Sequence, residues 1–207
     1  MRTEFLKVSA ALPAGPGGPA DPGGAAGAGP EPAPGPAAAR AGVVLPVSAG
    51  AVPPVSPARL GQIVRAIAAR PGQWRPAVRF RAGHRWYGRL GPPDPEAAYE
   101  VWLLSWLPGQ QTGFHDHGGA AGAFAIADGE LQERAARAGR SQVRGRVLGA
   151  GAVRAFGAAC VHDVRNISPA PAVSVHAYSP PLSAMRRYEM TSAGLALTGI
   201  ETPGSGW

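Results

Sequence analysis

Two histidines one residue apart are the first residues in this sequence whose types and spacing suggest chemistry. His115 and His117 stand in the segment HDH, and a strand there would point both imidazoles to the same side. Two imidazoles on one face can bind the same metal ion, although paired histidines are also common as ordinary surface or core residues. Because imidazole suits iron, zinc, copper and nickel alike, the pair does not name the metal.

The residues around this pair match the two sequence motifs of cupin β-barrels. Segment 109–129 follows the first motif: a glycine, five residues, His-x-His, four residues, an acid, six residues and a second glycine. Gly122 stands at the position of the acid. The second motif ends in a histidine and an asparagine, here His162 and Asn166, and small residues fill its other positions. The double match predicts that His162 joins the first two histidines in a metal site.

The missing acid changes the chemistry expected of such a site. A usual cupin site holds its metal with three histidines and one glutamate, whereas Gly122 offers no ligand. Three neutral imidazoles leave the charge of a divalent ion uncompensated, so one face of the metal stays open for anionic ligands and O2. A thiolate combined with O2 would require a redox-active metal such as iron.

A second row of polar side chains follows nearer the C-terminus. Segment 172–180, AVSVHAYSP, alternates apolar with polar residues. Successive side chains of a strand point to opposite faces, so a strand here places Ser174, His176 and Tyr178 together on one face.

The elements that position these residues are predicted to be short strands. Residues 56–70 are the exception, because Ser56 can cap a helix whose apolar residues recur at helical spacing. The pair Asp128-Gly129 predicts a tight hairpin within 122–137. Strands separated by turns are typical of barrels and jelly rolls, so we expect a mainly β fold, a cupin-type β-barrel or jelly roll with a short N-terminal helical part. Further strands are expected at 99–107, 141–148 and 152–156.

Composition divides the chain into two parts. Ala, Gly and Pro dominate residues 1–55, which cannot bury enough apolar surface to offset their ordering entropy. We therefore expect a disordered tail over 1–55 and a cupin domain over 56–207. The net charge of +7 falls in the second part, where the arginines are scattered, so we expect a solvated surface and no nucleic-acid site.

Cysteine content and hydropathy favour a cytoplasmic protein. Cys160 is the single cysteine and excludes an intramolecular disulfide. No apolar run has the length of a signal peptide or of a membrane span, so neither is expected. The oligomeric state stays open, and a monomer is compatible with the sequence.

These residues together resemble the bacterial cysteine dioxygenase, or thiol dioxygenase, family of the cupin superfamily. The resemblance implies that His115, His117 and His162 bind Fe(II). It also implies that the Tyr178 hydroxyl contacts the substrate or oxygen, that His176 orients this tyrosine and that Ser174 supports the histidine. The resemblance covers roughly 87–188 and is strongest in 106–124 (WLPGQQTGFHDHGGAAGAF), 161–169 (VHDVRNISP) and 172–182 (AVSVHAYSPPL).

The same resemblance bears on three further positions. Mammalian members carry a cysteine crosslinked to the tyrosine where Gly122 stands here, so Tyr178 should be uncrosslinked. Cysteine-selective members hold the substrate carboxylate with an arginine, and Arg89 in WYGRL, 26 residues before His115, stands at the corresponding place. The alternatives are Arg85 and a purely structural role for Arg89. Neither Cys160 nor His84 has motif support, and both are interpreted as structural.

The implied reaction converts L-cysteine and O2 into cysteine sulfinic acid. One alternative is a dioxygenase of another small thiol, such as 3-mercaptopropionate. Two others are a non-catalytic metal-binding cupin and a zinc- or nickel-dependent cupin isomerase, neither of which would consume O2 when a thiol is added.

Overall fold

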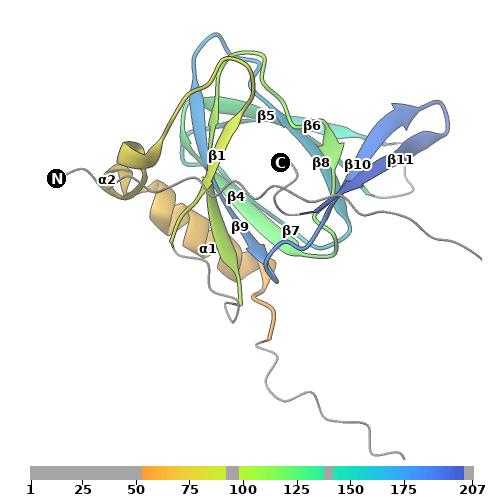
Figure 1. Cartoon of the computed structure of the whole chain (residues 1–207), viewed down its shortest axis with the longest axis horizontal. Coiled ribbons are helices and arrows are strands. Elements are labelled where there is room, and N and C mark those ends of the chain that lie inside the picture. Colours follow the sequence, from red (N-terminus) through yellow and green to blue (C-terminus); the bar gives the residue numbers. More distant parts are fainter. Residues whose placement is uncertain (1–52, 92–97, 138–141, 203–207) are drawn as a thin grey trace, which may run out of the picture. The chain divides into compact units, whose positions relative to one another are not determined.

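The strands of this chain form two antiparallel sheets that face each other (Figure 1). The computed structural model describes residues 53–91, 98–137 and 142–202. One sheet has five strands in the order β1-β2-β9-β4-β7, and the other has six in the order β11-β10-β3-β8-β5-β6. The strands are β1 Trp86–Arg89, β2 Glu100–Trp106, β3 Phe114–His115, β4 Ala121–Asp128, β5 Glu130–Arg137, β6 Arg144–Gly149, β7 Val153–Phe156, β8 Cys160–Arg165, β9 Ala172–Ser179, β10 Met185–Thr191 and β11 Gly194–Glu201.

The predicted mainly β fold of cupin jelly-roll type is confirmed. Along β4, Phe124 and Ile126 point into the core between the sheets, while the intervening alanines point outward. Within the described residues the two sheets are not joined by hydrogen bonds into a closed barrel. The fold is therefore a double-sheet jelly roll, whose interior lies between the sheets.

The predicted N-terminal helix covers the outer face of the five-stranded sheet. Helix α1 (Pro57–Ala68) begins after Ser56, whose hydroxyl accepts a hydrogen bond from the Arg59 amide. Leu60 and Val64 are fully buried against the alanine and valine side chains on the outside of β4 and β9. The short helices α2 (Pro71–Trp74) and η1 (Arg75–Ala77) follow α1.

The predicted hairpin at 122–137 is wrong. Asp128-Gly129 does form a turn between β4 and β5, and Gly129 has a φ of +74°. These two strands do not pair with each other, because β4 pairs with β7 and β9 whereas β5 pairs with β6 and β8. The turn passes the chain from one sheet to the other, a change that local turn chemistry does not reveal.

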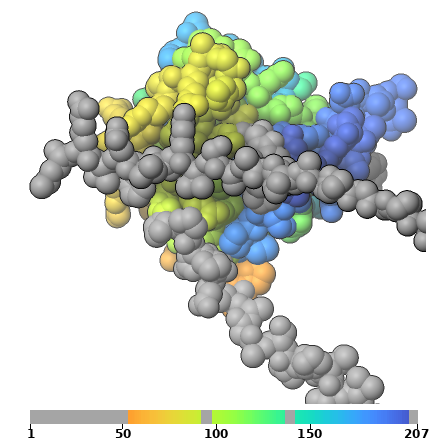
Figure 2. Space-filling view, viewed as in Figure 1, coloured from red at the N-terminus to blue at the C-terminus, as the bar shows by residue number. Residues whose placement is uncertain are grey.

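The predicted tail falls almost entirely on residues 1–52, outside the described residues. Its last residue, Val55, donates a backbone hydrogen bond to the Ser179 hydroxyl on β9, so contacts with the domain begin just before the helix. At the opposite end of the described chain, the β10–β11 hairpin stands at the edge of the six-stranded sheet (Figures 1 and 2). No helix in the described segments is long and apolar enough to cross a membrane.

Candidate metal centre

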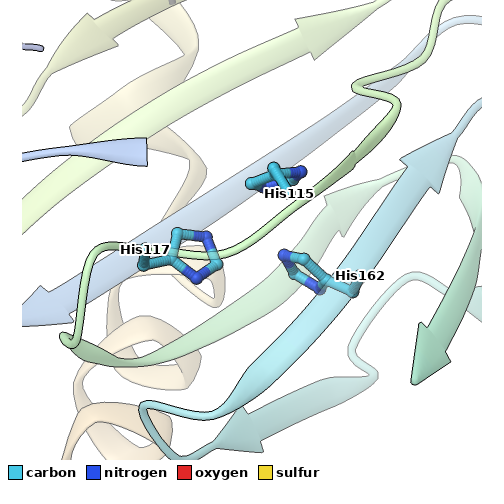
Figure 3. A group of neighbouring side chains, drawn as sticks. All are labelled: His115, His117 and His162. Atoms are coloured by element: carbon cyan, nitrogen blue, oxygen red, sulfur yellow. The ribbon is translucent and has the colours of Figure 1, made fainter. Parts of the chain in front are cut away.

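The three predicted ligands lie together between the sheets, with their rings turned toward one another (Figure 3). His115 lies on β3 and pairs in register with His162 on β8, so neighbouring strands present both rings on the same face. His117 comes two residues after His115, beyond the end of β3 rather than on the strand as predicted. All three are buried, and one ligand atom from each lies within 4.8 Å of the others.

The hydrogen bonds of these rings leave one nitrogen of each imidazole available. The Nδ1 of His115 lies 3.0 Å from the Gly113 carbonyl, and the Nδ1 of His162 lies 3.1 Å from Oε1 of Glu133. Both Nδ1 atoms therefore donate, and both Nε2 atoms can act as ligands. Nε2 of His117 is buried and has no hydrogen-bond partner among the described residues. A buried orphan nitrogen beside two other imidazoles fits a metal ion and is costly without one.

Burial keeps His115 and His117 in the form that binds metal. The pKa values of His115 and His117 lie well below their usual range, first because burial disfavours the charged imidazolium and second because the neighbouring histidines repel it. Metal ligation requires the neutral imidazole, so these two ligands stay available below the pH at which an exposed histidine is protonated.

The surroundings of Gly122, which stands where cupins usually have a fourth ligand, are sterically closed. A Cβ on Gly122 would lie 2.6 Å from the Phe156 ring and 3.0 Å from the Tyr178 ring. The Phe156 ring stacks on His117 with centroids 5.1 Å apart, and Tyr178 lies against the same imidazole at 4.6 Å. Two aromatic rings thus fill the space that a glutamate side chain would enter. The packing around Gly122 therefore leaves no room for a fourth protein ligand from this position.

We expect Gly122→Ala to destabilise the protein by about 1–3 kcal/mol, the usual cost of overpacking a core. The added methyl group must displace Phe156 or Tyr178, and either shift disturbs the ring packing around His117. Thermal unfolding measures the effect. Gly145→Ala is the matched control, because a Cβ there meets nothing within 4 Å. Equal melting temperatures for the two variants would contradict this steric account.

The predicted row on β9 forms a hydrogen-bonded chain. Ser174 Oγ lies 2.8 Å from Nε2 of His176, whose Nδ1 lies 3.1 Å from the Tyr178 hydroxyl. Trp106 on β2, which the sequence did not reveal, extends the chain because its indole N–H donates to Ser174 Oγ at 2.9 Å. An indole can only donate, so the serine proton is free for Nε2 of His176. Nδ1 then donates to the tyrosine oxygen.

This direction of donation leaves the Tyr178 O–H free for a ligand. Burial raises the pKa of Tyr178 well above its ordinary value, so the phenol stays protonated at neutral pH. The Phe124 ring stacks on His176 with centroids 5.1 Å apart and fixes the plane of that imidazole. The hydrogen-bonded row therefore holds Tyr178, a neutral hydrogen-bond donor, next to His117.

A narrow cavity connects the three-histidine group with the hydrogen-bonded row of Ser174, His176 and Tyr178. His115, His162, His176 and Tyr178 all contribute to its wall, as does Arg85 just before β1. Its volume of about 40 Å³ lies far below the roughly 300–1,000 Å³ of pockets for drug-sized ligands, so it suits a very small molecule. A wider cleft of about 760 Å³, which shares Arg85 with the cavity, lies beside it.

The structure places Arg85, and not Arg89, at this cavity. Arg89 forms an ion pair with Glu100 and lies over the Trp102 ring at 5.2 Å, so its charge already has a partner. Nε of Arg85 is buried without a hydrogen-bond partner among the described residues, and the guanidinium lies 5.0 Å from the Trp106 ring centroid. Burial lowers the pKa of Arg85 to about 10, which still leaves it charged at neutral pH.

The two residues without motif support are not part of the three-histidine group. Cys160 is partly buried at the start of β8, and burial, followed by the charge of Glu133, raises the pKa of its thiol to about 11. Such a thiol is largely protonated and unreactive at neutral pH. His84 is exposed in the wall of the wider cleft.

The sequence model of the family described as cysteine dioxygenase type I matches residues 58–191. This match spans more than half of the 207 residues and includes all three histidines and the polar row of β9. The chain belongs to the cysteine dioxygenase type I family. The resemblance seen in the sequence is thereby confirmed, and the buried three-histidine group supports a metal-dependent thiol dioxygenase as its broad class.

Solved structures similar to this cysteine dioxygenase family member share little of its sequence. The protein TT1209 from Thermus thermophilus is 21% identical, with a TM-score of 0.45, over 52% of this chain and 93% of its own. A Klebsiella pneumoniae protein with a double-stranded β-helix domain is 22% identical, with a TM-score of 0.43, over 60% and 93%. An oxalate oxidase in complex with glycolate is 18% identical, with a TM-score of 0.42, over 46% of this chain and 50% of its own. No curated protein matches this chain.

Proposed function

We propose that this protein is an Fe(II)-dependent dioxygenase that converts L-cysteine and O2 into cysteine sulfinic acid. In this reaction the thiol sulfur gains both oxygen atoms and loses four electrons, which O2 takes up. The observation that carries the proposal is a buried three-histidine cluster that shares one small cavity with an arginine and with a tyrosine donor. Family membership supports the same reaction class.

The metal cluster supplies the first part of this function. His115, His117 and His162 would hold Fe(II), which, when bound, supplies the redox chemistry between O2 and a thiolate. The described residues place no carboxylate among these ligands, so the positive charge there favours an anionic thiolate over a thiol. The small volume of the cavity supports a small thiol rather than a peptide.

Arg85 and Tyr178 supply the second part. The Arg85 guanidinium can pair with a substrate carboxylate in the geometry that arginine and carboxylate favour. Tyr178, whose O–H the His176 contact leaves free, would donate a hydrogen bond to the substrate or to oxygen. Two fixed donors on the same wall would hold a small carboxylate-bearing thiol in one orientation.

A related thiol, such as 3-mercaptopropionate, is the second candidate substrate, because Arg85 would pair with its carboxylate as well. Turnover of cysteine compared with that of mercaptopropionate distinguishes the two. A cupin that binds metal without turnover, or one that works as a zinc or nickel isomerase, would not consume O2 when a thiol is added. We propose no nucleic-acid partner and a cytoplasmic location, as the sequence predicts.

The test is anaerobic loading of the full chain with Fe(II), followed by an O2-electrode screen over several small thiols and analysis for sulfinate. We expect one equivalent of bound iron, O2 uptake that requires both iron and thiol, and one sulfinate formed per O2 consumed. Iron-loaded protein that yields no sulfinate from any small thiol would overturn the proposal. Equal turnover with zinc and with iron would overturn the metal assignment.

A further inference from the structure

A buried carboxylate contacts one of the three candidate metal ligands, and neither cupin motif predicted this contact. Glu133 lies on β5, and its side chain is fully buried. Its Oε1 accepts a hydrogen bond from Nδ1 of His162 at 3.1 Å. Its Oε2 accepts one from Nε of Arg154 at 2.7 Å, and Arg146 lies 3.5 Å from the same oxygen. The two carboxylate oxygens thus divide between a candidate metal ligand and two arginines.

Strand register explains why Glu133 reaches this histidine. Strand β5 pairs with β8 so that Ala135 lies opposite His162 and Glu133 lies opposite Val164. Residues 133 and 135 share one face of β5, which places Glu133 diagonal to His162 on the inner face of the sheet. Arg154 belongs to β7 in the other sheet, so its contact with Glu133 crosses between the sheets.

A carboxylate at this place changes the histidine in two ways. It holds the ring proton on Nδ1, so that Nε2 faces the cluster as a ligand. It also polarises the imidazole and makes Nε2 a stronger donor to a cation, as in other carboxylate–histidine–metal arrangements. His115 donates instead to a neutral carbonyl, so the three candidate ligands are not equivalent.

We propose that Glu133 is a positioning residue that holds His162 in the orientation and tautomer required for metal binding and strengthens its Nε2 as a ligand. Arg154 fixes the carboxylate by holding its second oxygen and limits its basicity. This inference rests on the proposed function, because it requires that the three histidines bind a metal ion.

The test measures metal affinity rather than turnover. Glu133→Gln in the full chain should weaken Fe(II) binding by about 10- to 100-fold in anaerobic competition with a chromophoric chelator. The reduction potential of the iron-loaded variant should rise, because less negative charge then stabilises the oxidised ion. Glu100→Gln is the matched control: it also removes a buried carboxylate, but one that contacts Arg89 and the Leu182 amide rather than a ligand. It should leave Fe(II) affinity unchanged.

Two outcomes separate this inference from the proposed function. If the wild-type chain binds no Fe(II), the proposed metal site fails and the role of Glu133 fails with it. If wild type binds Fe(II), and Glu133→Gln binds it within about twofold as tightly and at an unchanged potential, only the role of Glu133 is overturned. If Glu133→Gln does not fold because Arg154 is left unpaired, the double variant Glu133→Gln/Arg154→Gln removes both charges. Its Fe(II) affinity and reduction potential are then judged by the same two criteria.

Discussion

Replacement of His117 by alanine is expected to abolish stoichiometric iron binding and to reduce thiol-dependent O2 uptake by more than about 100-fold. Loss of a residue that only hydrogen-bonds to a metal ligand typically costs up to about 100-fold, so loss of a ligand itself should cost more. The structure singles out this ligand because its Nε2 is buried without a hydrogen-bond partner among the described residues. Loss of one of the three ligands leaves two imidazoles, which cannot hold a labile divalent ion firmly. Iron content after desalting and an O2 electrode measure the two effects.

The matched control is His84→Ala, which removes an exposed histidine of the wider cleft rather than one of the cluster. We expect that variant to keep the iron content of wild type. Circular dichroism should show that both variants are folded. A folded His117→Ala protein that keeps one equivalent of iron and full O2 uptake would remove His117 from the ligand set.

Arg85→Gln is expected to lower kcat/KM for L-cysteine by roughly 30-fold or more, mainly through a higher KM. Loss of one partner from a buried charge-assisted pair typically costs about 2 kcal/mol or more. Glutamine keeps hydrogen-bonding groups but cannot form the charged bidentate pair. Steady-state O2 uptake with cysteine and with cysteamine tests the cause, because cysteamine has no carboxylate and its kcat/KM should change little.

Arg89→Gln is the matched comparison, because the family spacing predicted this arginine whereas the structure pairs it with Glu100. We expect a smaller effect on cysteine turnover than for Arg85→Gln, together with some loss of stability from the unpaired glutamate. The reverse order, with Arg89→Gln losing cysteine turnover and Arg85→Gln retaining it, would restore the assignment made from the sequence.

The sequence predicted the site best where chemistry depends on short-range spacing. The alternating strand at 172–180 brings its polar side chains together through the pleat of the backbone. The His-x-His segment also brings its two rings together, although His117 lies beyond the end of β3. The second cupin motif identified His162 because the spacing between the residues of that motif is fixed. The structure places the His162 ring beside those of His115 and His117.

The sequence could not predict contacts set by strand register or by packing between the sheets. Glu133 meets His162 through the pairing of β5 with β8, and Trp106 meets Ser174 through the pairing of β2 with β9. The prediction of a hairpin at Asp128-Gly129 was wrong for the same reason, because the residues of a turn do not determine which sheet the next strand joins. Arg85 and Arg89 stand four residues apart in the chain, and only tertiary packing decides which of them faces the cavity.

The two sheets contribute different parts of the site. His115, His162 and Glu133 belong to the six-stranded sheet, whereas Trp106 and the polar row of β9 belong to the five-stranded sheet. Under the proposed function, changes to the hydrogen-bonded row of the five-stranded sheet would alter a substrate contact without replacing a candidate metal ligand on β3 or β8. The Arg154–Glu133 hydrogen bond links β7 of one sheet to β5 of the other, so it ties the row on β9 and the candidate ligands into one interior.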